Sequence, residues 1–216
     1  MKLFPNKYIS IEGNIGAGKT SFCQMICLDF NCKIVLEEFA QNPFLEYFYK
    51  DPTRYALTVE LFFLTERQKQ IQLEVSSTDL FYDFTISDYT ILKSLLFARA
   101  NLSAEEYKLY FKIYTALTHS LPKPDLIVYL HRDVPQVQSN IDKRGRLFET
   151  HISNEYLSKI QESYFYFFKN QTQLPVVVID LHDQDFIHDQ HIYNELKSIL
   201  TKSYAPGLHH IKILNT

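Results

Sequence analysis

A phosphate-binding pattern near the amino terminus is the strongest chemical signal in this chain. Every fixed position of G-x-x-x-x-G-K-[ST] is present in Gly13, Asn14, Ile15, Gly16, Ala17, Gly18, Lys19 and Thr20. Glycines let backbone N–H groups converge on phosphate oxygens, and the helix that follows adds partial positive charge at its N-terminus. We therefore predict that these residues bind a nucleoside triphosphate, with Lys19 on its terminal phosphates.

Acidic residues end the next two predicted strands. Glu37 and Glu38 end the second strand, and Asp88 ends the third. Ligands of doubly wound sheets bind at the carboxyl ends of the strands, so a carboxylate there can take a proton from an attacking hydroxyl. Asp88 can hold Mg²⁺ together with the Thr20 hydroxyl. The alternative is that these acids are solvated loop or capping residues.

A basic cluster follows a predicted helix further along the chain. Lys143, Arg144, Gly145 and Arg146 are consecutive, and Glu149 comes three residues later. Arginine forks suit the oxygens of a transferring phosphoryl group, and the glycine lets the segment move like a lid. A solvated run of charges is the alternative interpretation.

The elements that position these residues alternate between strands and helices. Such alternation predicts an α/β, three-layer P-loop NTPase-type fold: a parallel sheet with helices on both faces and a helical lid. A long helix is predicted from Pro52 to Val75, and a capping box of Ser103 and Glu106 opens another. We expect one domain over residues 1–203 and a tail, 204–216, of unknown role. Five strands are expected, at Tyr8–Glu12, Lys33–Glu37, Phe84–Asp88, Asp125–Leu130 and Pro175–Asp180.

Composition narrows the class of protein further. The chain has 216 residues, 46% of them hydrophobic, and a net charge of −3, which favours a packed domain and disfavours a broad nucleic-acid surface. No apolar run reaches the roughly 18 residues of a membrane span, and the first residues do not form a signal peptide. We therefore expect a cytoplasmic protein without a membrane or nucleic-acid polymer as partner.

The three cysteines, Cys23, Cys27 and Cys32, give no disulfide framework by number or spacing. Cys23 and Cys27 lie four residues apart on a predicted helix, but no second ligand pair completes a metal site. We interpret all three as small buried apolar groups.

The order and spacing of four motifs resemble the deoxynucleoside kinase family, in particular the bacterial deoxyadenosine and deoxyguanosine kinases. The likeness extends over about residues 7–200. The motifs are Tyr8–Thr20, Glu37-Glu38 before Asn42–Leu45, Asp51–Tyr55, and Arg144–Glu149 before Glu155–Leu157. The resemblance implies transfer of a phosphoryl group from ATP–Mg²⁺ to the 5′-hydroxyl of a small nucleoside, by a homodimer.

The same resemblance implies roles for individual residues. Glu37 matches the general base. Tyr49 and Glu149 match contacts to the sugar 3′-hydroxyl, and Arg144 and Arg146 match lid arginines on the ATP phosphates. Glu60 and Arg67 match residues that contact the nucleobase. Residues 182–186, with Asp183, Asp185 and Phe186, match the segment that holds the adenine of ATP. Asp88 matches a residue that binds the metal and the substrate, and Tyr89 lies beside it at the substrate site.

The chain departs from the family pattern at several of these positions. The residue after Asp88 is usually an arginine that supports the catalytic carboxylate, but here it is Tyr89, so Arg67 or a lid residue is expected to supply the charge. Ser94 and Asn140 replace an aspartate and an arginine. Glu60 replaces a base-reading glutamine. An ionised carboxylate only accepts hydrogen bonds, so Glu60 favours a purine edge with two donors, as in deoxyguanosine.

Two other functions stay open from the sequence. A nucleoside monophosphate kinase of the thymidylate type shares the fold, but its acceptor needs cations near Glu37, and residues 37–55 offer only Lys50 and Arg54. A non-catalytic nucleotide-binding relative is the third possibility, because fold likeness does not certify chemistry.

Overall fold

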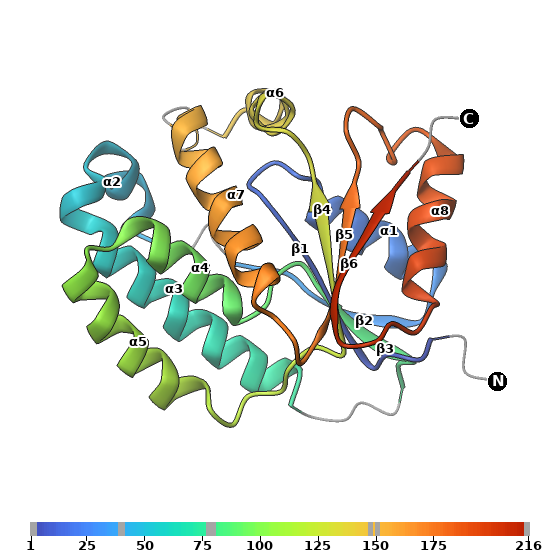
Figure 1. The fold of residues 1–216 in the computed structure, drawn as a ribbon, viewed down its shortest axis with the longest axis horizontal. Coiled ribbons are helices and arrows are strands. Elements are labelled where there is room, and N and C mark those ends of the chain that lie inside the picture. Colours follow the sequence, from blue (N-terminus) through green and yellow to red (C-terminus); the bar gives the residue numbers. More distant parts are fainter. Residues whose placement is uncertain (1–3, 39–41, 77–80, 147–148, 150–151, 214–216) are drawn as a thin grey trace.

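The computed structural model describes residues 4–38, 42–76, 81–146, 149 and 152–213. Within them, six strands form one parallel sheet in the order β2-β3-β1-β4-β5-β6 (Figure 1). The strands are β1 (Tyr8–Gly13), β2 (Cys32–Val35), β3 (Phe84–Ser87), β4 (Leu126–His131), β5 (Pro175–Asp180) and β6 (Gly207–Lys212). The predicted three-layer α/β fold is confirmed.

Helices cover both faces of this sheet (Figure 1). The helices α1 and α8 pack on one face, where Phe22, Ile26 and Leu196 join the main hydrophobic cluster of the sheet. On the other face, Tyr164 of α7 and Leu96 of α4 pack against β4 and β5. The helices are α1 (Lys19–Asp29), α2 (Leu45–Lys50), α3 (Pro52–Glu74), α4 (Leu92–Asn101), α5 (Ala104–Thr118), α6 (Val134–Arg144), α7 (Asn154–Lys169) and α8 (Gln190–Leu200).

The first strand lies at the centre of the sheet, and all six of its residues are buried. It pairs with β3 on one side and with β4 on the other. The chain leaves β1 toward β2 and β3, and later continues on the opposite side of β1. This reversal of strand order opens a crevice at the carboxyl ends of the strands, where ligands of such sheets bind.

The expectation of five strands was wrong, because the tail adds a sixth. Gly207–Lys212 pairs in parallel with β5 at the edge of the sheet. Its residues alternate between half-buried and exposed, since an edge strand is covered less completely than a central one. The last residues of the tail, 214–216, lie outside the described residues.

Helix starts follow the sequence signals closely. Pro52 occupies the first turn of α3, and the Asp51 side chain accepts a hydrogen bond from the Arg54 N–H. The predicted capping box of Ser103 and Glu106 opens α5. The helix α4 was not predicted. It lies between β3 and α5 and carries residues of the cavity described below.

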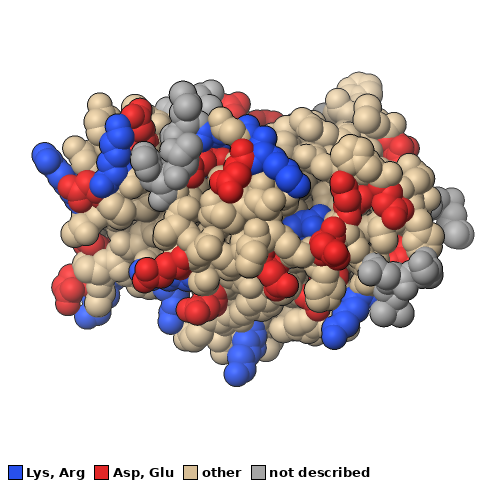
Figure 2. All heavy atoms as spheres, turned by 90° about the horizontal axis from the view of Figure 1, so that it is seen from above, with Lys and Arg blue, Asp and Glu red and all other residues tan. Residues whose placement is uncertain are grey.

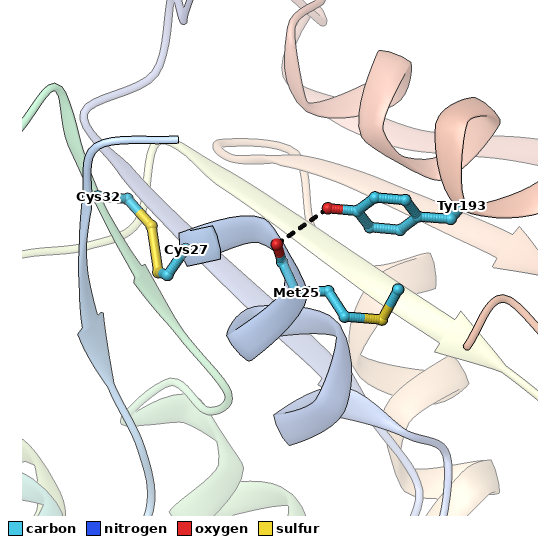
Figure 3. Close-up of a disulfide and its surroundings, with 4 residues drawn as sticks. All are labelled: Met25, Cys27, Cys32 and Tyr193. Carbon is cyan, nitrogen blue, oxygen red and sulfur yellow. Dashed lines mark hydrogen bonds between the residues drawn. A yellow bond between two sulfur atoms is a disulfide. The ribbon is translucent and has the colours of Figure 1, made fainter. Parts of the chain in front are cut away.

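The interpretation of the cysteines was wrong for two of them. Cys27 and Cys32 form a disulfide between the last turn of α1 and the start of β2 (Figure 3). The chain reverses between these elements and brings their Cα atoms to 5.5 Å, within the span of a disulfide. Sequence spacing alone does not reveal that reversal. Cys23 is a free buried thiol, as expected.

Charges of both signs are interspersed on the molecular face seen from above in Figure 2. In the described part of the chain, no helix is both long and apolar enough to cross a bilayer.

Candidate active site

A cavity opens at the carboxyl ends of the strands, beside the phosphate-binding loop. It is open to solvent at its mouth, and about 760 Å³ of empty space, part of it open solvent, lies between the residues that line it. Twelve residues singled out in the sequence line it: Ile15, Gly16, Lys19, Thr20, Glu37, Tyr49, Glu60, Arg67, Asp88, Arg144, Arg146 and Glu149.

The phosphate-binding loop has a fixed shape. Gly16 has φ 81°, and a Cβ there would lie 2.6 Å from the Val137 carbonyl oxygen, so a side chain cannot be accommodated. The Asn14 side-chain amide donates to the Leu157 carbonyl at 2.9 Å. Lys19 Nζ donates to the carbonyls of Gly13 and Asn14, both at 2.9 Å. These bonds hold the loop and its lysine at the floor of the cavity.

Asp88 connects this loop to the carboxylate opposite. One oxygen accepts from the Thr20 hydroxyl at 2.5 Å, and the other accepts from the backbone N–H of Glu37 at 2.8 Å. Asp88 is buried, whereas Thr20 is exposed at the helix start. The aspartate therefore fixes the distance between the start of α1 and the segment that carries Glu37.

The Glu37 side chain is held by two cations. Arg67 donates to Oε1 from Nε and Nη2, both at 2.7 Å, and Lys93 Nζ donates to Oε2 at 2.5 Å. Burial would raise the pKa of Glu37, but the Lys93 and Arg67 charges outweigh burial and lower the pKa to about 2. Glu37 is therefore ionised at neutral pH and oriented from two sides.

Glu60 is buried deeper in the same cavity. Its Oε1 accepts from the Asn101 amide at 2.7 Å, while its buried Oε2 has no hydrogen-bond partner among the residues that the structure describes. Burial raises the pKa of Glu60 to about 7, although the nearby Arg67 charge lowers it in part. A buried acceptor without a donor costs free energy, so Oε2 is a place where a ligand donor would be stabilised.

Arg144 and Arg146, the arginines predicted to form a lid, are both bound to Glu149. Arg144 forms a fork, with Nη2 2.7 Å from Oε1 and 2.6 Å from Oε2, and with Nε 3.1 Å from Oε2. Arg146 Nη1 lies 3.4 Å from Oε1. Gly145 ends α6 with φ 66° and turns the chain toward the cavity. The lid residues 147 and 148 lie outside the described residues.

Tyr49 lines the cavity and packs its ring against Phe48 and Tyr156. Burial raises the pKa of Tyr49, and the nearby Glu149 charge raises it further. Its neutral hydroxyl is thus available as a donor or an acceptor beside the lid carboxylate.

Other predicted residues lie away from the cavity. Tyr89 is fully buried, and its hydroxyl donates to Gln70 Oε1 at 2.6 Å, toward α3. Phe186 is a core residue packed under Gly18. Asp185 accepts from two backbone N–H groups and His188 in its own turn, and Asp183 is exposed. The adenine site at residues 182–186 stays a prediction.

Sequence reasoning missed Lys93, Phe63 and Phe97, all of which line the cavity. It also missed Asn101, the partner of Glu60. Lys93 could have been noticed in the sequence, since it is the single charge between Ile91 and Phe97, a run in which all residues but Lys93 and Ser94 are apolar. A lysine in such a run is either paired or functional when buried. The two phenylalanines had no signal that separates them from core residues.

A phosphate-binding loop, an oriented carboxylate and lid arginines around one cavity define a P-loop kinase with a small acceptor. A family model described as "Deoxynucleoside kinase" matches residues 9–203. The chain belongs to the deoxynucleoside kinase family and is an enzyme that transfers phosphate to a nucleoside hydroxyl. The resemblance seen in the sequence is confirmed.

Individual relatives support the same placement. The chain is 35% identical over 187 residues to deoxyguanosine kinase of Bacillus subtilis (strain 168), covering 83% of this chain and 89% of the relative. It is 28% identical over 199 residues to deoxyadenosine/deoxycytidine kinase of the same organism, covering 90% of each. The structure of M. mycoides deoxyadenosine kinase with bound dCTP matches with TM-score 0.74 and 28% identity, over 88% of this chain and 99% of that one.

Proposed function

We propose that this enzyme transfers the γ-phosphoryl group of ATP to the 5′-hydroxyl of a purine deoxynucleoside, with Glu37 as the general base. The observation that carries the proposal is the joint position of Glu37, Lys19 and Arg144 around one cavity. An ionised carboxylate opposite a phosphate-binding loop can accept the proton of a hydroxyl that attacks the terminal phosphorus.

The phosphate side of the reaction uses fixed positive groups. The loop N–H groups and Lys19 would hold the β- and γ-phosphates, and Arg144 and Arg146 would close on the transferring group from the lid. Such transfer depends on positioning and charge stabilisation more than on covalent chemistry. Residues 182–186 would hold the adenine of ATP.

The donors near the loop fit a magnesium ion. Thr20 and Asp88 offer only oxygen atoms, which Mg²⁺ prefers. Among the described residues, no cluster of three or more His, Cys, Asp or Glu is found. When bound, Mg²⁺ neutralises charge on the phosphates.

The acceptor would lie between the loop and α3. Tyr49 and Glu149 would contact the sugar 3′-hydroxyl, and the fork between Arg144 and Glu149 would open as the phosphates recruit the arginine. Glu60 would read the nucleobase through its unpartnered oxygen. An ionised Glu60 presents two acceptor oxygens, which match the N1–H and N2–H₂ donors of guanine, so deoxyguanosine is the substrate that we propose.

The test is a direct assay of the purified protein with ATP–Mg²⁺ and a panel of deoxynucleosides and their monophosphates. We expect phosphorylation of nucleosides, deoxyguanosine foremost, and none of monophosphates. Turnover of monophosphates alone would support the thymidylate-type kinase instead. ATP binding without any acceptor turnover would support the non-catalytic alternative.

Substrate choice is expected to depend on pH through Glu60. Because its pKa is raised to about 7, the ionised, two-acceptor form gains population as pH rises through neutrality. The charges of Arg67 and Glu37 act on Glu60, and neither changes between about pH 6 and pH 8, because the pKa of Glu37 is lowered to about 2 and that of Arg67 is raised above its usual value. The ratio of kcat/KM for deoxyguanosine to that for deoxyadenosine should rise severalfold between about pH 6 and pH 8.

Glu60→Gln is the matched variant for this prediction, because it keeps the shape and removes the titration. We expect it to lose the pH dependence and to shift preference from deoxyguanosine toward deoxyadenosine by about tenfold or more. An unchanged preference in Glu60→Gln would remove Glu60 from base reading.

The homodimer and the cytoplasmic location also stay predictions. Leu109 and Phe111 on α5 are large exposed apolar side chains that a partner helix could cover. Light scattering of the purified protein distinguishes a dimer from a monomer.

A further inference from the structure

A buried lysine of α4, Lys93, contacts Glu37, the proposed general base. Lys93 lies in the first turn of α4 and is 6% exposed. Its Nζ donates to Glu37 Oε2, the oxygen that Arg67 leaves free. Each carboxylate oxygen thus has its own cationic donor, from α4 and from α3, and the plane of the carboxylate is fixed between two helices.

Hydrogen bonds fix the position of the first turn of α4 and therefore of Lys93. The backbone N–H of Thr90 donates to Glu12 Oε1 at 2.7 Å, and the N–H of Lys93 donates to the Thr90 carbonyl at 3.1 Å. Glu12 is held in turn by the Tyr164 hydroxyl at 2.8 Å. Side chains of a helix lean toward its N-terminus, which directs Lys93 toward the end of β3 and the cavity.

The Tyr89 side chain does not occupy the position beside Glu37 that Lys93 fills. It follows Asp88 directly, but its ring packs in the cluster of α3, α4 and α5, and its hydroxyl bonds to Gln70. The end of β3 therefore contributes a carboxylate and no cation of its own. Lys93 is the ammonium that reaches Glu37 from this side.

The electrostatic surroundings place Lys93 among reacting groups. It lines the same cavity as Lys19 and Glu37. Burial, and next the neighbouring Lys93 charge, lower the pKa of Lys19 to about 8, so the two ammonium groups repel one another. The repulsion between two like charges destabilises the fold, so stability alone does not explain why Lys93 lies close to Lys19.

We propose that Lys93 is a positioning residue that orients the Glu37 carboxylate toward the acceptor hydroxyl and supplies the positive charge that Tyr89 lacks. The inference rests on the proposed function, since it requires Glu37 to act on the acceptor. Lys93 acts through Glu37 and needs no contact with the substrate.

The experiment compares Lys93→Met and Lys93→Arg in single-turnover and steady-state assays with ATP–Mg²⁺ and deoxyguanosine. Lys93→Met should lower the single-turnover rate by about 100-fold, as for loss of one preorganised donor, with the KM values of both substrates changed less than about threefold. Lys93→Arg should recover at least about tenfold of that loss, because it restores the charge. Lys197→Met, which removes an ion pair to Asp29 on the far side of the fold, should keep the wild-type rate.

A double variant separates this inference from the proposed function. If Lys93 acts through Glu37, adding Lys93→Met to Glu37→Gln should cost no further rate. A full additional 100-fold loss, or a wild-type rate in Lys93→Met, would overturn the role of Lys93 while leaving Glu37 as base. A wild-type rate in Glu37→Gln would instead overturn the proposed function at its base.

Folding is the remaining risk, because Lys93→Met leaves part of a buried charge unpaired. Lys93→Gln covers this case, since its amide still donates to Glu37 Oε2 without a charge. It should show the same loss in rate, and a rate equal to that of Lys93→Arg would contradict the need for an ammonium at this position.

Discussion

Replacing Glu37 with glutamine is expected to lower kcat by about 10²–10⁴-fold, the usual contribution of a positioned general base. The amide keeps the shape of the side chain and still accepts from Arg67, but it cannot take a proton. Lys93 loses its acceptor at Oε2. KM values should change little, because the loss falls on the transition state. Rapid-quench measurement of nucleoside monophosphate formation is the direct check.

The fold should survive this substitution with reduced stability. Removing one member of a buried charge cluster costs roughly 3–5 kcal/mol, and a domain of this size loses about 2–4 °C of Tm per kcal/mol. A drop in Tm of about 6–20 °C is therefore expected, with native circular dichroism at 25 °C. Glu38→Gln is the matched control, since Glu38 is exposed and does not line the cavity. Equal activity in the Glu37 and Glu38 variants would exclude Glu37 as the base.

Local signals explain why much of the fold could be predicted. The phosphate-binding loop is defined by eight consecutive residues, so its shape depends on few distant contacts. Strands such as β4 and β5 are continuous apolar runs, as expected when helices cover both faces of a parallel sheet. The loop residues, Glu37 and Asp88 follow β1, β2 and β3 closely, which placed them at one edge of the sheet.

What could not be predicted depends on contacts between distant parts of the chain. Lys93 reaches Glu37 across 56 positions, and the apolar residues of α4 show no clear helical periodicity, because Lys93, Ser94 and Arg99 interrupt them. Tyr89 turns away from the cavity because Gln70 of α3 accepts its hydroxyl. The pairing of the tail with β5 is likewise a tertiary feature, so the sequence alone assigned no role to residues 204–216.

The lid gives the second large effect, because its arginine would act on charge that develops during transfer. Arg144→Met is expected to lower kcat by about 10³-fold, in the range measured for arginines that stabilise a transferring phosphoryl group. Arg144 is about one-third exposed, so its ion pair with Glu149 contributes only about 1 kcal/mol to folding. Tm should therefore fall by a few degrees at most. Arg99→Met, which removes an arginine stacked on Tyr166, is the control and should keep full activity.

The bidentate ion pair implies that Glu149 and the ATP phosphates compete for Arg144. The direction in which the KM for the nucleoside changes tests this competition. In the structure, Arg144 occupies both oxygens of Glu149, the group proposed to contact the sugar 3′-hydroxyl. In Arg144→Met that carboxylate loses its main competitor, so the KM for the nucleoside should stay constant or fall while kcat collapses. If kcat is preserved and the nucleoside KM rises instead, Arg144 serves only to hold Glu149 in place. The charge that stabilises transfer would then have to come from Arg146 or from the loop itself.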